Sequence, residues 1–308
     1  MHRFPYWQMD VFAARRGGGN PLGVVLDARG WTATAMQDFA RWTGLVETTF
    51  VLPAEVEGAD YRVRMFTPRR EIPFAAHPSL GTAHALIESG RLPQRERLVQ
   101  QCGIGCIELR TAPGEDGLQL FLRAPRAVPV EPPEAQRRMA LELLGARLRG
   151  PEHLACMEGG RRWWIAEFRD ELALRSWDAP IDAIASLARS SDTLGLCGFA
   201  RTGTDPALVV RAFPAGVGIA EDPASGAANG LIAAWLRHAE PEGPLARGYR
   251  VSQGREMGHD ALVELHCEAD GTIWVGGRSL AIVRGEVEWT IRASKATAAA
   301  CAAPCAST

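Results

Sequence analysis

Several features that identify common protein classes are missing from this sequence. Its 308 residues carry a formal net charge of only -2 and a single lysine, Lys295, so no basic surface for nucleic acid or an anionic membrane is indicated. No run of 18 apolar residues occurs, and the N-terminal segment lacks the apolar core of a signal peptide, so we expect neither a membrane span nor secretion. Seven cysteines, an odd number with irregular spacing, are typical of reduced thiols and predict a cytoplasmic location.

Common catalytic and binding motifs are missing too. The sequence contains no Gly-x-Ser-x-Gly elbow and no Walker loop, and the glycines at positions 17–19 lack the spacing of a dinucleotide fingerprint. Cys102 and Cys106 lie almost 200 residues from the pair Cys301 and Cys305, so we expect no metal site. Neither of the two segments described next contains a cysteine, which argues against a racemase that works with two thiols.

A short motif occurs twice, 145 residues apart. Residues 77–81 read HPSLG and residues 222–226 read DPASG, and a strand-like stretch precedes each copy. Asp followed by Pro is a favoured helix start, so the motif predicts two helices whose N-caps are His77 and Asp222. Because the N-terminus of a helix offers unpaired N–H groups, the repeat indicates two similar halves that face a shared pocket for a carboxylate or phosphate.

The glycines of the repeat admit two interpretations. Gly81 and Gly226 fall in the first turn of the expected helices, where each costs roughly 1 kcal/mol relative to alanine. Either a ligand approaches the bare backbone closely, or small residues let a helix or strand pack tightly. The presence of two copies in register favours the ligand.

The pattern along the chain predicts an α+β protein in which strands outnumber helices. An amphipathic helix is expected over residues 34–43 with Thr32 or Thr34 as its cap, and an apolar helix follows each copy of the repeat, over residues 78–89 and 223–238. A sheet wrapped around each apolar helix would bury it on all sides. The proline-rich residues 126–134 are the expected linker, and residues 293–308 are expected to be disordered.

Glu47 is the strongest candidate for proton transfer. It lies between an expected helix end and a strand and has apolar neighbours, so burial would raise its pKa toward neutrality. The alternative is a solvated turn or capping glutamate. If the two halves face one another, His77 and Asp222 approach the same ligand from opposite sides, which suits acid–base chemistry or substrate anchoring. For Asp222, simple helix capping is an equally open interpretation.

Six blocks together resemble the PhzF-like phenazine-biosynthesis isomerase family, from about residue 5 to 290. The blocks are residues 19–25 (GNPLGVV), 46–50 (VETTF), 64–68 (RMFTP), 74–83 (FAAHPSLGTA), 221–228 (EDPASGAA) and 253–258 (QGREMG). The resemblance implies a diaminopimelate-epimerase-like fold, in which two similar domains, each a β-barrel around a central helix, are related by a pseudo-two-fold axis. We accordingly expect domains at residues 1–126 and 127–280, with a strand at about 280–292 returning to the first. The resemblance also implies homodimers without cofactors.

The same resemblance implies roles for individual residues. In the phenazine isomerase the glutamate matching Glu47 moves a proton between ring carbons of trans-2,3-dihydro-3-hydroxyanthranilate, and the residues matching His77 and Asp222 bind and polarise the substrate. The residues expected to bind substrate are Asn20, Ala76, Pro78, Ser79, Ser225, Gly226 and Ala227. The family pattern has glycine at Ala76, serine at Ala227 and arginine at His259, and these departures argue for a different substrate.

These observations predict a cofactor-independent isomerase or epimerase of a small carboxylate from secondary metabolism. A lyase or cyclase that uses the same proton abstraction is one alternative. A non-catalytic small-molecule binding protein is another, favoured by the missing hydroxyl at Ala227.

Overall fold

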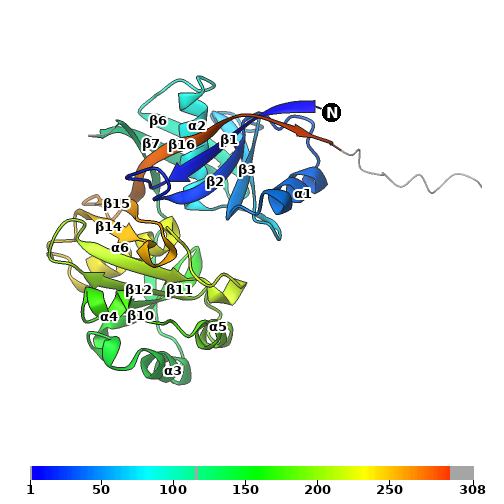
Figure 1. The fold of residues 1–308 in the computed structure, drawn as a ribbon. Coiled ribbons are helices and arrows are strands. Elements are labelled where there is room, and N and C mark those ends of the chain that lie inside the picture. The colour runs from blue at the N-terminus through cyan, green and yellow to red at the C-terminus, as the bar shows by residue number, and fades with distance from the viewer. Residues whose placement is uncertain (1, 115–116, 292–308) are drawn as a thin grey trace, which may run out of the picture.

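The computed structural model describes residues 2–114 and 117–291, and the tail expected to be disordered, residues 293–308, lies outside them. Its 16 strands are joined into one continuous hydrogen-bonded assembly. Figure 1 shows two lobes, with α2 in the upper lobe and α6 in the lower one. Within the described residues no helix is both long and apolar enough to cross a membrane.

A closed ring of eight strands forms the upper lobe. In the ring β1 pairs with β2, the pairing continues through β3, β4, β6, β7, β8 and β16, and β16 pairs with β1 again. The strands of this lobe, including the short β5 that pairs with β4, are β1 (His2–Val11), β2 (Asn20–Val25), β3 (Glu47–Leu52), β4 (Tyr61–Phe66), β5 (Glu71–Ile72), β6 (Arg97–Cys102), β7 (Gly105–Gly114), β8 (Gly117–Arg123) and β16 (Ile273–Trp289).

Helix α2 (Ala76–Glu88) lies inside this ring. Every residue from Ala76 to Leu86 is buried, because strands surround the helix instead of covering one face. This explains why its sequence is apolar around the whole circumference, as predicted. Helix α1 (Ala33–Thr43) packs outside the ring, and its cap is Thr32, whose hydroxyl accepts from the Ala35 N–H.

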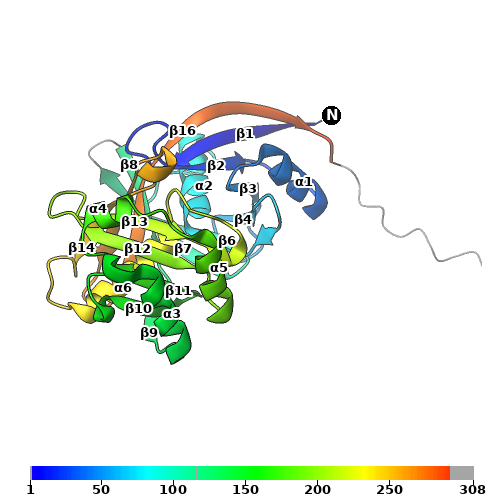
Figure 2. The same ribbon diagram turned by 60° about the horizontal axis from the view of Figure 1, so that its bottom comes forward.

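The lower lobe contains α6 (Gly226–Ala239), which contacts β9, β10, β11, β15 and β16. Its strands follow the order β16, β15, β14, β13, β12, β11, β10 and β9. Their bounds are β9 (Val128–Val130), β10 (Leu154–Gly159), β11 (Arg161–Glu167), β12 (Leu196–Arg201), β13 (Leu208–Phe213), β14 (Gly248–Gln253) and β15 (Ala261–Cys267). Three further helices lie outside the strands in Figure 2: α3 (Glu134–Leu144), α4 (Glu171–Arg175) and α5 (Ile181–Ser190).

The long strand β16 belongs to both lobes. Its first part pairs with β15 and β8, and its part from Ser279 onward pairs with β1. The strand expected at about residues 280–292 is therefore the second part of a longer strand that begins at Ile273. Gly277 has φ of 146°, a conformation that favours glycine, and its neighbour Gly276 lies so close to β8 that a Cβ would be 2.1 Å from the Leu120 carbonyl oxygen. The glycines therefore let the strand continue from one lobe to the other.

The predicted helix starts require correction. Helix α2 begins at Ala76, with no side-chain cap, so His77 is its second residue and not its N-cap. Helix α6 begins at Gly226 and is capped by Ser225, so Asp222 precedes the helix by four positions and lies in a bridge to Ala212. The Asp-Pro pattern was misleading because the Asp222 side chain has other partners, described below. The expected linker at residues 126–134 includes strand β9.

Candidate active site

Glu47 and His77 lie side by side in the upper lobe. His77 Nε2 is 3.2 Å from Glu47 Oε2, and both residues are buried, with 6% and 8% of their surfaces exposed for His77 and Glu47 respectively. In the part of the chain that the structure describes, neither of these two atoms has a well-aligned hydrogen bond.

The backbone explains how Glu47 reaches this place. Helix α1 ends at Gly44, whose φ of 65° turns the chain toward β3. Glu47 is the first residue of β3 and lies opposite Leu22 in the parallel pairing with β2. Because β2 and β3 line the ring beside α2, the Glu47 carboxyl group faces the start of that helix.

Burial dominates the electrostatics of this pair. Loss of solvent, together with the charge of Asp222, raises the pKa of Glu47 to about 8. Burial lowers the pKa of His77 to about 3, although a hydrogen bond with the Pro21 backbone opposes the shift. Near neutral pH the pair therefore consists of a protonated carboxyl group beside a neutral imidazole, and the carboxyl group titrates in the range that general acid–base catalysis requires.

Asp222 joins the pair from the lower lobe. The Asn20 side-chain amide, at the start of β2, donates to Asp222 Oδ1 at 3.0 Å and to the Ala224 carbonyl at 2.9 Å. The Ala224 N–H also donates to Asp222 Oδ1. Burial raises the pKa of Asp222 to about 7, and hydrogen bonds from Ala224, Ser225 and Asn20 oppose this shift. The carboxyl groups of Glu47 and Asp222 therefore both have pKa values close to neutral pH.

Sequence reasoning missed the role of Gln253, the last residue of β14. Its Oε1 accepts from the Ser225 N–H and the Asn229 side chain, and its Nε2 donates to the Asp222 carbonyl. Gln253 is fully buried and fixes both the start of α6 and the loop that carries Asp222. No signal within this strand marked Gln253, because β14 reads GYRVSQ and contains other polar residues.

The two central helices meet at their N-termini. A Cβ at Gly226 would lie 2.6 Å from the Cβ of Ala76, the first residue of α2. A Cβ at Gly81 would lie 2.6 Å from side-chain atoms of both Leu22 and Val11. Tight packing, the second of the two interpretations, therefore explains why neither position tolerates a side chain, and binding of a ligand near Gly226 stays a prediction.

The remaining predicted residues lie around this junction. The Ser79 hydroxyl donates to the Ala75 carbonyl and accepts from Gln100, so it serves the fold. Ser225 Oγ accepts from the Ala228 N–H, and the Ser225 side chain also hydrogen-bonds to Asp222. Pro78 lies in the first turn of α2, where its missing N–H breaks no helical bond. Gln253 accepts from the Ser225 N–H and Ser225 Oγ accepts from the Ala228 N–H, so neither bond uses the N–H groups of Gly226 and Ala227.

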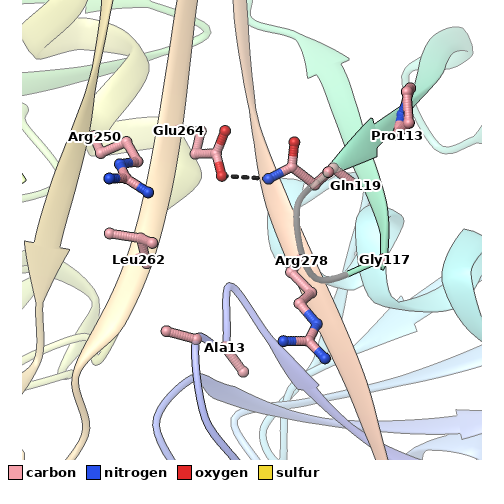
Figure 3. A pocket seen from close by; sticks show the side chains of 10 residues that line it. Ala13, Pro113, Gly117, Gln119, Arg250, Leu262, Glu264 and Arg278 are labelled. Carbon is pink, nitrogen blue, oxygen red and sulfur yellow. Dashed lines mark hydrogen bonds between the residues drawn. The ribbon is translucent and has the colours of Figure 1, made fainter.

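Two cavities of the structure are lined by other residues. One, of about 330 Å³, lies between β8, β14, β15 and β16, where Gln119 donates to Glu264 (Figure 3). The other, of about 430 Å³, lies beside the second half of α2. Glu47, His77 and Asp222 line neither cavity.

Comparisons with known proteins identify the family. Residues 9–285 match the family described as "Phenazine biosynthesis-like protein". The chain is 29% identical to trans-2,3-dihydro-3-hydroxyanthranilate isomerase of Pseudomonas aeruginosa, with 92% of this chain and 99% of that protein covered. It is 26% identical to the protein named antisense-enhancing sequence 1 of Schizosaccharomyces pombe, with 93% and 99% covered.

Solved structures show the same fold. A phenazine biosynthesis protein of the PhzF family from Bacillus anthracis superimposes with a TM-score of 0.79 at 23% identity, covering 94% of this chain and all of that one. A hydroxyproline epimerase from Agrobacterium vitis superimposes with a TM-score of 0.61 at 12% identity, with 93% and 91% covered. The match across most of the sequence and the shared fold together show that this chain belongs to the phenazine biosynthesis-like family and is an isomerase.

Proposed function

We propose that this protein is an isomerase that moves a proton between two carbon atoms of a small carboxylate, with Glu47 as the proton carrier. The observation that supports this most directly is the buried Glu47 carboxyl group, whose pKa of about 8 allows it both to take up and to release a proton near neutrality. The adjacent neutral His77 and the Asn20–Asp222 pair would position the substrate. No step in this scheme requires a cofactor.

The substrate carboxylate would bind at the meeting point of α2 and α6. The N-termini of both helices point there, and their partial positive charge favours an anion. Because Asn20, Glu47 and His77 are almost completely buried, substrate entry requires the two lobes to separate locally. We take the lobes as two domains, residues 1–126 with the end of β16 and residues 127–280, related by a pseudo-two-fold axis.

The substrate class and the setting are also part of this proposal. We propose a metabolite of secondary metabolism that differs from trans-2,3-dihydro-3-hydroxyanthranilate, because Ala76 and Ala227 narrow the junction and remove a hydroxyl that the family pattern provides. We further propose that the enzyme acts in the cytoplasm as a homodimer.

Solvent exchange tests the role of Glu47. In D₂O, the wild-type protein should incorporate deuterium at carbon into a carboxylate that it binds, and NMR follows the incorporation. The first probe is trans-2,3-dihydro-3-hydroxyanthranilate, followed by other small cyclic and unsaturated carboxylates. Glu47→Gln should lower the exchange rate about 10²-fold or more while binding persists, because it removes only the proton carrier. Glu55→Gln, an exposed glutamate outside the site, is the matched control.

Three outcomes would contradict this scheme. Undiminished exchange in Glu47→Gln would exclude Glu47 as the carrier. Binding of carboxylates by the wild-type protein without any exchange or turnover would instead support a non-catalytic binding protein, and a product of different composition would support a lyase or cyclase.

A further inference from the structure

The second part of β16 has a partner strand on only one of its two edges. Over residues 274–276 the strand lies between β8 on one edge and β15 on the other. The pairing with β8 extends to Arg278, whereas β1 continues on the side of β15, because Ala13, just after β1, pairs with Ala261 of β15. Among the described strands, Ser279–Trp289 therefore pairs with β1 alone, and Figure 2 shows this part of β16 as the outermost ribbon of the upper lobe.

This edge is exposed along five consecutive residues, 282–286. Two of them are large and apolar, since Ile282 and Val283 are exposed by 45% and 43% of their surfaces. An unpaired strand edge presents backbone N–H and C=O groups that can pair with a further strand. Apolar side chains on such an edge favour that pairing, because the further strand would remove them from water.

The sequence of the edge is complementary to itself. Residues 283–287 read VRGEV. If a second copy pairs antiparallel about a two-fold axis through Gly285, Arg284 lies opposite the partner's Glu286, and Val283 lies opposite the partner's Val287. The axis repeats both contacts, so one face of the ribbon has two pairs of opposite charge and the other face has two pairs of valines. Both are favourable combinations across two strands.

Gly285 has no role that the single chain explains. Glycine weakens the interior of a strand, so its presence there needs a reason. Its φ is not positive, and a Cβ at this position would meet no atom within 4 Å beyond its chain neighbours. Neither conformation nor packing within one subunit therefore requires glycine. At a two-fold axis, glycine lets the backbones of two copies approach without two identical side chains facing each other.

The two charged residues of the edge are available for a partner. Within the described residues, the Glu286 side chain has neither a hydrogen bond nor an ion pair. Arg284 contacts Glu88 of its own subunit and lies over the Trp7 ring, 5.2 Å from its centre. The Arg284 side chain is nevertheless 48% exposed, and the contact with Glu88 leaves further N–H donors of its guanidinium group unused. The partner's Glu286 can therefore bind Arg284 without displacing Glu88.

We propose that a second copy of this chain binds along residues 283–287 of β16, so that the two copies form one continuous antiparallel sheet across a two-fold axis. The bulge at Ile282, which has no partner residue in β1, limits the pairing on one side. The proposal extends the homodimer of the proposed function by assigning its surface. It does not depend on the chemistry of Glu47.

The mass of the full chain in solution tests this surface. Sedimentation velocity of the wild type, measured against concentration, should show a dimer of twice the chain mass of 33.3 kDa. Glu286→Arg should weaken the dimer about tenfold or more, because both pairs of opposite charge become pairs of like charge. Glu57→Arg, the same change at another exposed glutamate, should dimerise like the wild type.

A mixture of two variants tests the register. Arg284→Glu also places like charges opposite each other, so its own dimer should be weakened in the same way as that of Glu286→Arg. Equal amounts of the two variants should instead form a heterodimer, since each supplies the charge that the other lacks and every pair is again of opposite sign. Circular dichroism verifies that both variants fold.

Three results would overturn the proposal. A wild-type chain that stays monomeric would show that the charged residues and the bulge protect this edge from association. A dimer that Glu286→Arg leaves unchanged would place the interface on another surface. A mixture without preference for the heterodimer would exclude the register centred on Gly285. Glu47→Gln should dimerise like the wild type, so failure of this proposal and failure of the proposed function are distinguishable.

Discussion

The side-chain amide of Asn20 donates to Asp222 Oδ1 at 3.0 Å, although 202 positions separate the two residues in the sequence. This bond joins the start of β2 in one lobe to the loop before α6 in the other. The second hydrogen of the same amide is donated to the Ala224 carbonyl. Asn20 therefore ties the loop that carries Asp222 to the upper lobe, where the charge of Asp222 raises the pKa of Glu47.

Replacement of Asn20 should destabilise the protein and disturb Asp222. In Asn20→Ala, two buried acceptors lose their donor, and we expect a loss of about 1–3 kcal/mol in the free energy of unfolding, measured by urea denaturation. Asn20→Asp should cost more at pH 8 than at pH 5, because a second carboxylate then faces Asp222. An equal cost at both pH values would show that the two groups do not interact.

The raised pKa of Glu47 predicts that stability falls with increasing pH. The native protein retains a proton on Glu47 up to about pH 8, whereas the unfolded chain has released it above about pH 4.5. Between pH 7 and 8, above the native pKa of Asp222, the native state thus binds more protons at Glu47, so this residue should lower the free energy of unfolding by up to about 1.4 kcal/mol per pH unit. His77 is neutral in both states across most of this window, because its native pKa of about 3 lies below its ordinary value of 6.5.

Urea midpoints measured from pH 6.5 to 8.5 would test this dependence. Glu47→Gln should flatten the decline, since glutamine does not titrate, and Glu55→Gln should leave it unchanged. Parallel curves for the wild type and Glu47→Gln would mean that Glu47 has an ordinary pKa.

The contact between the two helix starts predicts a compensating pair of mutations. Gly226→Ala would place a Cβ 2.6 Å from the Ala76 Cβ and should destabilise the protein by about 1–3 kcal/mol through overpacking. Adding Ala76→Gly should recover most of this loss, because it removes the atom that clashes. A double-mutant cycle in urea measures the coupling, and additive effects would indicate that the helices do not meet as described.

Gln253 should contribute more to stability than an ordinary glutamine. Gln253→Leu leaves the Ser225 N–H, the Asn229 amide and the Asp222 carbonyl without their partner, which should cost roughly 2–4 kcal/mol. Gln37→Leu is the control, since the Gln37 side chain makes one hydrogen bond, to the Thr67 carbonyl, at a partly exposed position. Similar losses of Tm in the two variants would argue against this role of Gln253.

The spacing and composition of single segments predicted helices α1, α2 and α6, because these features depend on neighbouring residues in the sequence. The spacing of apolar residues predicted helix α1. Its cap is Thr32, one of the two candidates, Thr32 and Thr34. The apolar character of α2 and α6 indicated helices surrounded by strands, and both are indeed central in their lobes. The resemblance across six blocks indicated the family that the comparisons show.

The sequence motif did not predict the residue at which each of the two central helices begins. The motifs are 145 positions apart in the sequence, whereas α2 and α6 begin 150 positions apart, at Ala76 and Gly226. The start of α6 is fixed by Ser225, and by Gln253 from a strand that follows later in the chain. A pattern confined to the helix does not contain that information.

The sequence by itself determined the type of protein: strands around two apolar helices, a small set of polar residues at their starts, and Glu47 with apolar neighbours. These features depend on composition and periodicity, which each segment carries alone. Only the tertiary structure decided that Glu47 lies 3.2 Å from His77, that the Asn20 amide bonds to Asp222, and that Gly226 makes room for the Cβ of Ala76. Burial and hydrogen bonds between distant segments set these contacts and the pKa values that follow from them.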